Sequence, residues 1–114
     1  MSECLFCKIG EEEIPSERVF EDADIIAFRD IHPKAPVHIL IMPKVHIASI
    51  ALLKKEDEIL AGKMIGIAKM LAAKEGLEGY KLVFNVGKKG GQIINHLHLH
   101  LMGGWDEAPG KVEV

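Results

Sequence analysis

The sequence predicts an α+β fold, in which a mostly antiparallel, five-stranded sheet is combined with one long and one short helix. Two observations indicate this class. Segments with the composition of strands follow one another directly, and one long segment between them has apolar residues at helical spacing. The 114 residues are enough to bury a core, so we expect a single domain over residues 1–114, with a short tail at 105–114.

Composition and charge exclude several classes of protein. The chain is 48% hydrophobic and 27% charged with a net charge of -3, which is typical of a globular protein without a sequence-independent affinity for nucleic acid. The apolar run at 37–42 is too short to cross a bilayer, and the first residues lack the pattern of a signal peptide. We therefore expect a cytoplasmic protein that binds neither membranes nor nucleic acid. Its two cysteines should serve as metal ligands or free thiols rather than form a disulfide.

The first part of the chain contains a short helix and three strands. They are expected at about 4–10, 17–21, 24–30 and 37–43. Gly10 ends the helix, because glycine readily adopts the backbone conformation that follows a last helical turn. The first two strands meet at a turn that begins with Asp22, and Pro43 ends the third strand.

The second part contains the long helix and two more strands. The helix is expected at about 55–75, the fourth strand at 80–86, a glycine-rich loop at 87–91 and the fifth strand from 96 onward. Gly76 provides the stop signal of the helix. The apolar stripe of the helix, which we expect to pack in the core, consists of Leu60, Met64, Ile67, Ala68 and Leu71.

The fifth strand carries three histidines in alternation with leucines, in the stretch HLHLHLMGG at 96–104. Because side chains alternate across a strand, His96, His98 and His100 share one face, and the leucines on the other face pack under the long helix. A lone histidine on a strand is usually structural. Three in strict alternation indicate a functional site.

A single metal ion does not account for all three histidines. At a rise of about 3.3 Å per residue, the backbones of His96 and His100 stand about 13 Å apart, whereas Zn–N bonds measure about 2.0–2.1 Å. Neighbours two residues apart could share an ion or one phosphate group. We therefore expect the three histidines to have separate roles.

The loop before the histidines, NVGKKGGQ at 85–92, has the composition of a phosphate site. Asn85 and Gln92 provide amide side chains, and glycines such as Gly91 let backbone N–H groups approach an anion closely. Glycines between strands most often form plain turns. The position of this loop directly before the three histidines favours the anion site.

These motifs resemble those of a known family. HLHLHLMGG is similar to the signature of the histidine triad superfamily, in which three histidines alternate with apolar residues. FEDADIIAFRDIHPKAPVHILIMPKVHI at 20–47 and NVGKKGGQ resemble other blocks of its nucleoside phosphoramidase branch. The resemblance extends from about Cys4 to Gly104 and implies the α+β fold of that family, as a homodimer whose two sheets join into one.

The resemblance also implies roles for individual residues. His98 would be the nucleophile, and His100 and His38 would bind and neutralise the phosphate. The implied nucleotide site consists of Asp30 at the ribose hydroxyls, Ile31 near the base, Asn85, Gly91, Gln92 and Ile93 on the phosphate and leaving-group side, His98 and His100 at the phosphate, and Phe6, Phe28 and Leu40, which are candidates for the purine pocket that could equally be core.

The chemistry of these residues is consistent with those roles. A neutral imidazole can attack an α-phosphorus and form a nucleotidyl-histidine, which water then hydrolyses. Attack requires a free lone pair on one nitrogen, so we expect the other nitrogen of His98 to carry the proton and to be held by an acceptor such as a backbone carbonyl. His100, His38 and loop N–H groups would stabilise the developing charge, and no catalytic metal is required.

The sequence Cys4-Leu-Phe-Cys7 is a possible half of a zinc site, because four ligands are needed and only two are local. His46 and His96 are the spare histidines. The resemblance supports this set, since some prokaryotic relatives and the galactose-1-phosphate uridylyltransferases have a structural zinc with two cysteines and two histidines. Free thiols are the alternative. We interpret His32 as an exposed loop residue without a role.

Two features depart from the resembling pattern. A serine commonly follows the Gly-Gly-Gln of the phosphoramidase branch, where it can hydrogen-bond the leaving nitrogen, but this chain has Ile93, which cannot donate. The tail WDEAPGKVEV at 105–114 is also short, whereas in relatives the tail helps to shape the substrate pocket of the dimer.

The sequence thus predicts a nucleotide hydrolase. We expect it to cleave purine nucleoside 5′-phosphoramidates or related mixed anhydrides, with AMP or GMP as the nucleotide part, through a covalent intermediate on His98. Two alternatives are hydrolysis of dinucleoside polyphosphates and a regulatory or adaptor protein that binds nucleotides without turnover. An intact nucleophile argues against a pure binding protein.

Overall fold

The computed structural model describes residues 4–109 and contains the predicted five-stranded antiparallel sheet. Its spatial order is β1-β2-β3-β5-β4, and each strand is antiparallel to its neighbours. The strands are β1 (Arg18–Glu21), β2 (Ile25–Arg29), β3 (Val37–Pro43), β4 (Tyr80–Val83) and β5 (Leu99–Gly103). The prediction of the fold class is confirmed, although β4 ends before the expected residue 86.

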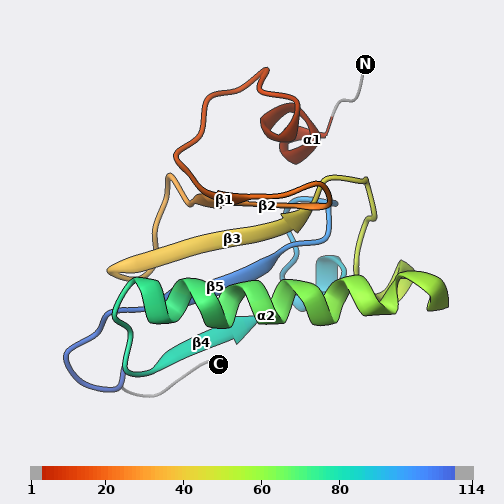
Figure 1. Ribbon diagram of the computed structural model, residues 1–114. Coiled ribbons are helices and arrows are strands. Elements are labelled where there is room, and N and C mark those ends of the chain that lie inside the picture. Colours follow the sequence, from red (N-terminus) through yellow and green to blue (C-terminus); the bar gives the residue numbers. More distant parts are fainter. Residues whose placement is uncertain (1–3, 110–114) are drawn as a thin grey trace.

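Two helices lie on opposite faces of this sheet (Figure 1). They are α1 (Leu5–Gly10) and α2 (Glu58–Lys74), and short 3-10 turns lie at Ile50–Leu52, Lys55–Asp57 and Lys88–Gly90. The turn at Lys55–Asp57 accounts for the expected start of the long helix at residue 55, because it leads directly into α2. Within residues 4–109 no helix is long and apolar enough to span a membrane.

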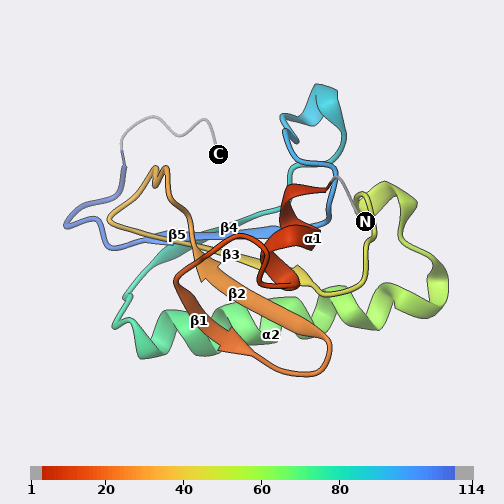
Figure 2. The ribbon, with the colours of Figure 1, turned by 90° about the horizontal axis from the view of Figure 1, so that it is seen from above.

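The core is divided into two layers because side chains alternate along each strand. Under α2, the stripe of Met64, Ile67, Ala68 and Leu71 packs on one face of β2, β3 and β5. On the other face, Phe6 of α1 joins a smaller cluster with Phe28 and Leu40. Figure 2 shows this arrangement from above, with α1 in front of the central strands and α2 behind them. The buried histidines His38 and His98 therefore lie on the α1 face.

The prediction that the fifth strand begins at residue 96 is wrong, because β5 begins at Leu99. The last pair between β3 and β5 joins Ile41 to Leu99, and the following residue on the same side of β3 is Pro43, which has no N–H to donate. The N–H of Leu97 donates instead to the carbonyl of Ile47 at 2.6 Å. The alternation nevertheless persists, since Leu97 is buried under α2 with the other leucines while His96 is not part of that cluster.

Candidate active site

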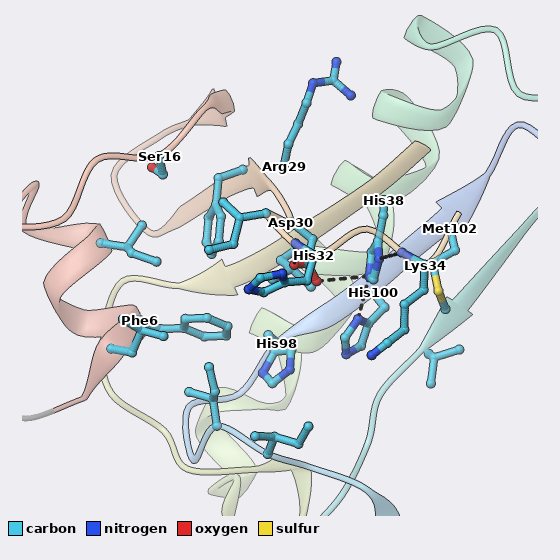
Figure 3. A pocket seen from close by; sticks show the side chains of 18 of the residues that line it. Phe6, Ser16, Arg29, Asp30, His32, Lys34, His38, His98, His100 and Met102 are labelled. Carbon is cyan, nitrogen blue, oxygen red and sulfur yellow. Dashed lines mark hydrogen bonds and ion pairs between the residues drawn. The ribbon is translucent and has the colours of Figure 1, made fainter. Parts of the chain in front are cut away.

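A cavity of about 870 Å³ lies on the α1 face of the sheet (Figure 3). One end is apolar, the centre is formed by histidines, and the other end carries lysines. Figure 3 shows Phe6 at one end, His98 and His100 in the centre, and Lys34 and Met102 beyond them. The cavity is also lined by Phe28, Leu40, Asp30, His38, Lys81 and Trp105.

A backbone carbonyl sets the tautomer of His98. Its Nδ1 lies 2.6 Å from the carbonyl oxygen of His96, and because a carbonyl can only accept, Nδ1 carries the proton. The Nε2 atom of the neutral ring therefore keeps its lone pair. The pKa of His98 is lowered mainly by burial, which favours this neutral form at pH 7. The carbonyl acceptor expected from the chemistry is thus present.

A chain of hydrogen bonds sets the tautomers of the other two central histidines. The backbone N–H of Lys34 donates to Nδ1 of His38 at 3.0 Å, so a neutral His38 carries its proton on Nε2. That Nε2 lies 3.0 Å from Nδ1 of His100 and donates to it. A neutral His100 then has its own proton on Nε2. The chain leaves one N–H donor on the ring that is next to His98.

Burial keeps both of these rings neutral. It is the largest cause that lowers the pKa of His100 to about 4, and the neighbouring His98 and His38 lower it further. Burial also lowers the pKa of His38, although the negative charge of Asp30 opposes this effect. The two histidines therefore act at pH 7 as hydrogen-bond donors rather than as fixed positive charges.

Asp30 stands at the end of β2 beside this chain. Its Oδ1 accepts the backbone N–H of His32 at 2.9 Å, and its Oδ2 lies 3.5 Å from Nε2 of His38. Asp30, His38 and His100 have possible metal-ligand atoms within 4.8 Å of one another. However, the N–H of Lys34 donates to Nδ1 of His38, so the neutral ring carries its proton on Nε2. This Nε2–H points into the cluster, where a metal ion would need a lone pair. The donor set therefore favours hydrogen bonding over metal binding.

The loop at 85–92 divides between the cavity and the interior. Asn85 and Gly91 line the cavity, and Gly91 has a φ of 87°, a conformation that glycine adopts without strain. Gln92 is not among the lining residues. It is buried, its amide donates to the carbonyls of Ala48 at 2.6 Å and Ile94 at 2.9 Å, and its oxygen accepts the N–H of Gly87 at 2.9 Å. The side chain of Gln92 therefore holds the loop in place through these three hydrogen bonds.

The apolar residues predicted for a base pocket belong both to the core and to the cavity wall. The ring of Phe6 meets Phe28 edge-on at 5.6 Å and His98 edge-on at 4.9 Å between centroids. Leu40 is buried beside them. Ile31 and Ile93 also line the cavity, but they are 81% and 88% exposed, so they form its rim. The isoleucine at position 93 offers no hydrogen-bond donor there.

The four predicted zinc ligands lie together, with their ligand atoms within 4.8 Å of one another. The Sγ of Cys4 is 3.4 Å from Nδ1 of His96, and the Sγ of Cys7 is 3.4 Å from Nδ1 of His46 and 3.5 Å from Nδ1 of His96. In a tetrahedral site with Zn–S bonds of about 2.3 Å and Zn–N bonds of about 2.0–2.1 Å, sulfur and nitrogen ligands stand about 3.6 Å apart. The cluster is therefore compatible with zinc.

The hydrogen bond made by Nε2 of His96 also supports a metal site at this cluster. Its Nε2 lies 2.8 Å from the carbonyl oxygen of Pro43, which can only accept, so the proton is on Nε2 and the Nδ1 lone pair faces the cysteines. An outer hydrogen bond of this kind is typical of histidines that bind a metal.

Several lining residues were not identified from the sequence. His32 lines the cavity, although we expected it to have no role, and so do Lys34, Lys81, Met102 and Trp105. Lysines in loops and at strand edges are common on any surface, so no local pattern distinguishes these two. Only the pairing of β4 with β5 and the path of the loop after β2 bring them to the histidines.

Comparisons with known proteins identify relatives of this chain. The family model described as "Scavenger mRNA decapping enzyme C-term binding" matches residues 3–113. Protein HitA of Neisseria gonorrhoeae is 46% identical over 90% of this chain and 97% of its own length. The purine nucleoside phosphoramidase of Escherichia coli K12 is 44% identical, covering 90% and 87% of the two chains. The 14 kDa zinc-binding protein of Zea mays is 50% identical, covering 90% and 83%.

Solved structures with the same fold include a HIT family hydrolase from Legionella pneumophila, which is 54% identical with a TM-score of 0.87 and covers 90% of this chain and 94% of its own. A histidine triad protein from Clostridium difficile is 34% identical with a TM-score of 0.91, and the alignment covers 97% and 98% of the two chains.

Proposed function

The chain belongs to the histidine triad (HIT) family, and from that membership we propose that it hydrolyses purine nucleoside 5′-phosphoramidates and related mixed anhydrides at the α-phosphate. The observation that carries this proposal is the tautomer of His98. The bond from Nδ1 to the carbonyl of His96 directs the lone pair of Nε2 away from that carbonyl, in a residue that lines the cavity. The relatedness to a purine nucleoside phosphoramidase supports the choice of substrate.

Substrate binding uses the three parts of the cavity in order. The purine base lies at the apolar end beside Phe6 and Phe28, where aromatic rings provide flat contact surfaces. The ribose hydroxyls donate to the carboxylate of Asp30. The α-phosphate then reaches the rings of His98 and His100. In this placement the phosphorus lies next to Nε2 of His98, which has a free lone pair because the proton of the ring is held on Nδ1.

In the first step, Nε2 of His98 forms a bond to phosphorus while the bond to the leaving group breaks. The ring becomes positively charged, and the Nδ1–H bond to the carbonyl of His96 stabilises that charge. The Nε2–H of His100 donates to a phosphoryl oxygen, and His38 supports it through the chain of hydrogen bonds. A departing amine takes a proton from water or from the substrate.

In the second step, water attacks the nucleotidyl-histidine. The N–P bond breaks, its electron pair returns to Nε2 of His98, and the nucleoside monophosphate is released together with a proton. Both steps use side chains and backbone groups of this chain, and no step is assigned to a metal.

We assign zinc to the cluster of Cys4, Cys7, His46 and His96, with a structural role. The cysteines are the N-cap of α1 and a residue of its first turns, whereas His96 precedes β5, so one ion would connect the first helix to the last strand. Zinc thiolates require reduced cysteines, which is consistent with the expected cytoplasmic location. The zinc-binding relative from Zea mays supports this assignment.

We also propose a homodimer in which β4 pairs with its copy. It is an edge strand of the sheet, and its Tyr80 and Leu82 are 39% and 38% exposed. Ile59 and Met70 of α2 are exposed as well. An open edge next to exposed apolar side chains favours continuation of the sheet into a second protomer.

The nucleophile is tested with His98→Ala and a fluorogenic AMP amidate. Turnover should be abolished while AMP binding, measured by calorimetry, stays within about tenfold, because the base and ribose contacts remain. His32→Ala, which removes an exposed histidine of the same cavity, is the matched control and should retain turnover. Wild-type turnover by His98→Ala would exclude the covalent mechanism. AMP binding without any turnover by the wild type would instead support the regulatory alternative.

A further inference from the structure

The end of the cavity beyond His100 has no role in the mechanism above, yet it has a defined chemical character. Cross-strand pairing places His38 beside Met102 and Met102 beside Lys81, so these three side chains share the cavity face of β3, β5 and β4. Lys81 therefore stands two strands away from His38, about 10 Å at a strand spacing of about 4.8 Å. Met102 forms an apolar floor between them.

Lys34 approaches the same place from the loop after β2. Figure 3 shows its side chain extending beside His100, with the ammonium group near that ring. The positive charge of Lys34 also lowers the pKa of both His38 and His100, which agrees with this proximity. Two ammonium groups thus flank the cavity on the side of His100 that is away from Phe6.

Neither ammonium group has an acidic partner in the part of the chain that the structure describes. Among residues 4–109 no carboxylate lies within ion-pair distance of Lys34 or Lys81, and both lysines line the cavity, unlike the other described lysines without an acidic partner. The Nζ of Lys81 lies 5.3 Å from the centroid of the Trp105 ring, which leaves its N–H groups available to a ligand. This end of the cavity is therefore suited to an anion.

An amine leaving group and an anionic leaving group place different demands on the protein. An amine must receive a proton as its bond to phosphorus breaks, and the rim residue Ile93 cannot supply one. A carboxylate or phosphate leaves with the electron pair of the broken P–O bond and needs no proton. With the base beside Phe6 and the α-phosphate beside His98 and His100, a leaving group that extends past His100 would carry this negative charge next to Lys34 and Lys81.

We propose that Lys34 and Lys81 form a subsite that selects anionic leaving groups, so that the preferred substrates are mixed anhydrides of a purine nucleoside 5′-phosphate with a carboxylate or a further phosphate. This inference rests on the proposed hydrolase function and narrows its substrate class. In the first step Nε2 of His98 forms a bond to phosphorus, and the P–O bond of the anhydride breaks with its electron pair on the leaving oxygen. A carboxylate and a phosphate would be recognised in the same way, through the negative charge on that oxygen.

The test uses two aryl esters of AMP whose phenols have the same pKa, one of which carries an additional carboxylate. For the wild type, kcat/KM should be about tenfold higher for the charged ester at low ionic strength, and added salt should reduce this preference. In Lys34→Gln/Lys81→Gln the ratio should fall to about one, with little change for the neutral ester. The matched control, Lys69→Gln/Lys74→Gln, removes two exposed charges from α2 and should keep the wild-type ratio.

Acetyl adenylate and ADP then distinguish the two sources of the oxyanion. A loss of kcat/KM in the lysine variant for only one of them identifies that class as the substrate, and a loss for both shows that the subsite reads charge alone. A ratio of about one in the wild type, or an unchanged ratio in the lysine variant, overturns the subsite but leaves the hydrolase function intact. Absence of turnover for every substrate overturns the hydrolase function itself.

Discussion

At the scale of single residues, backbone groups decide which nitrogen of each histidine is available for chemistry. The carbonyl of His96 holds the proton of His98 on Nδ1, and the N–H of Lys34 holds the proton of His38 on Nε2. A carbonyl can only accept and an amide N–H can only donate, so these assignments depend on backbone geometry rather than on pH. The lone pair on Nε2 of His98 and the donor chain through His38 and His100 are therefore set before any ligand binds.

The buried histidines make stability depend on pH. The pKa of His100 is about 4 in the folded protein, mainly because of burial, and about 6.5 in an unfolded chain. Between these values the unfolded state binds a proton that the folded state does not. The free energy of unfolding should therefore be highest above pH 6.5 and decrease as the pH falls towards 4, by on the order of 1–3 kcal/mol for this residue.

Urea unfolding at pH 7.5 and pH 4.5 checks this prediction. His100→Asn should lose less stability than the wild type over this interval, and acid release of a metal would affect both proteins alike. Equal losses in the two proteins would show that His100 does not contribute to the pH dependence.

Ile93 should make the wild type sensitive to its leaving group. A serine hydroxyl at this exposed rim position could protonate or relay a proton to a departing amine, which isoleucine cannot do. Ile93→Ser should therefore raise the rate on alkyl amidates by about tenfold and change activated substrates little. The measurement is kcat/KM across amidates of graded leaving-group pKa. Parallel plots for the two proteins would show that Ile93 only packs at the rim.

At the scale of elements, α1 depends on its surroundings. With six residues it is too short to be stable alone, and it is held by the buried side chains of Phe6 and Ile9 and by the cysteines at its start. The same helix places Phe6 against His98. The helix and its N-cap thus provide both cysteines of the Cys/His cluster and, through Phe6, part of the apolar wall of the cavity.

The purified protein should contain about one zinc per chain. Because the ion would tie α1 to the segment before β5, a chelator should lower the melting temperature more than it lowers activity at moderate temperature, where the carbonyl of Pro43 still holds His96. Elemental analysis and thermal melts of the wild type and of Cys4→Ser/Cys7→Ser measure both effects. Zinc absent from protein prepared without chelators, or equal zinc in the cysteine variant, would contradict the assignment.

At the scale of the whole molecule, the two faces of the sheet have separate tasks. The face under α2 contains the main hydrophobic core, and the α1 face contains the cavity and the Cys/His cluster. The edge strand β4 lies next to the lysine subsite proposed above, because Lys81 belongs to that strand. Assembly through β4 would therefore place the second protomer close to the leaving-group end of each cavity.

The wild type should sediment as a dimer at micromolar concentration. Leu82→Lys puts a charge on the edge strand and should shift the protein to the monomer. Leu52→Lys, a change of the same kind at a position that is 69% exposed on a 3-10 turn, should remain dimeric. Analytical ultracentrifugation distinguishes these states. A monomeric wild type would contradict pairing through β4.

Local patterns in the sequence were sufficient for the fold class and for the two-sided character of the histidine stretch. The spacing of Met64, Ile67 and Leu71 predicted the buried face of α2, and the alternation after His96 predicted that the leucines enter the core. Such patterns can be predicted because the period of a helix or an extended chain is a property of consecutive residues. The motifs at His98 and Cys4 likewise consist of neighbours in the chain.

Only the tertiary structure decided which distant groups meet. Four features depend on strand register and loop paths: the start of β5 at Leu99, the donation from Lys34 to His38, the interior position of Gln92 and the position of Lys81 beside Met102. Register follows from many weak contacts summed over whole strands, and a loop path follows from the elements that it connects. Neither is encoded in a short stretch of residues, so the tautomer chain and the lysine subsite became visible only when the chain was folded.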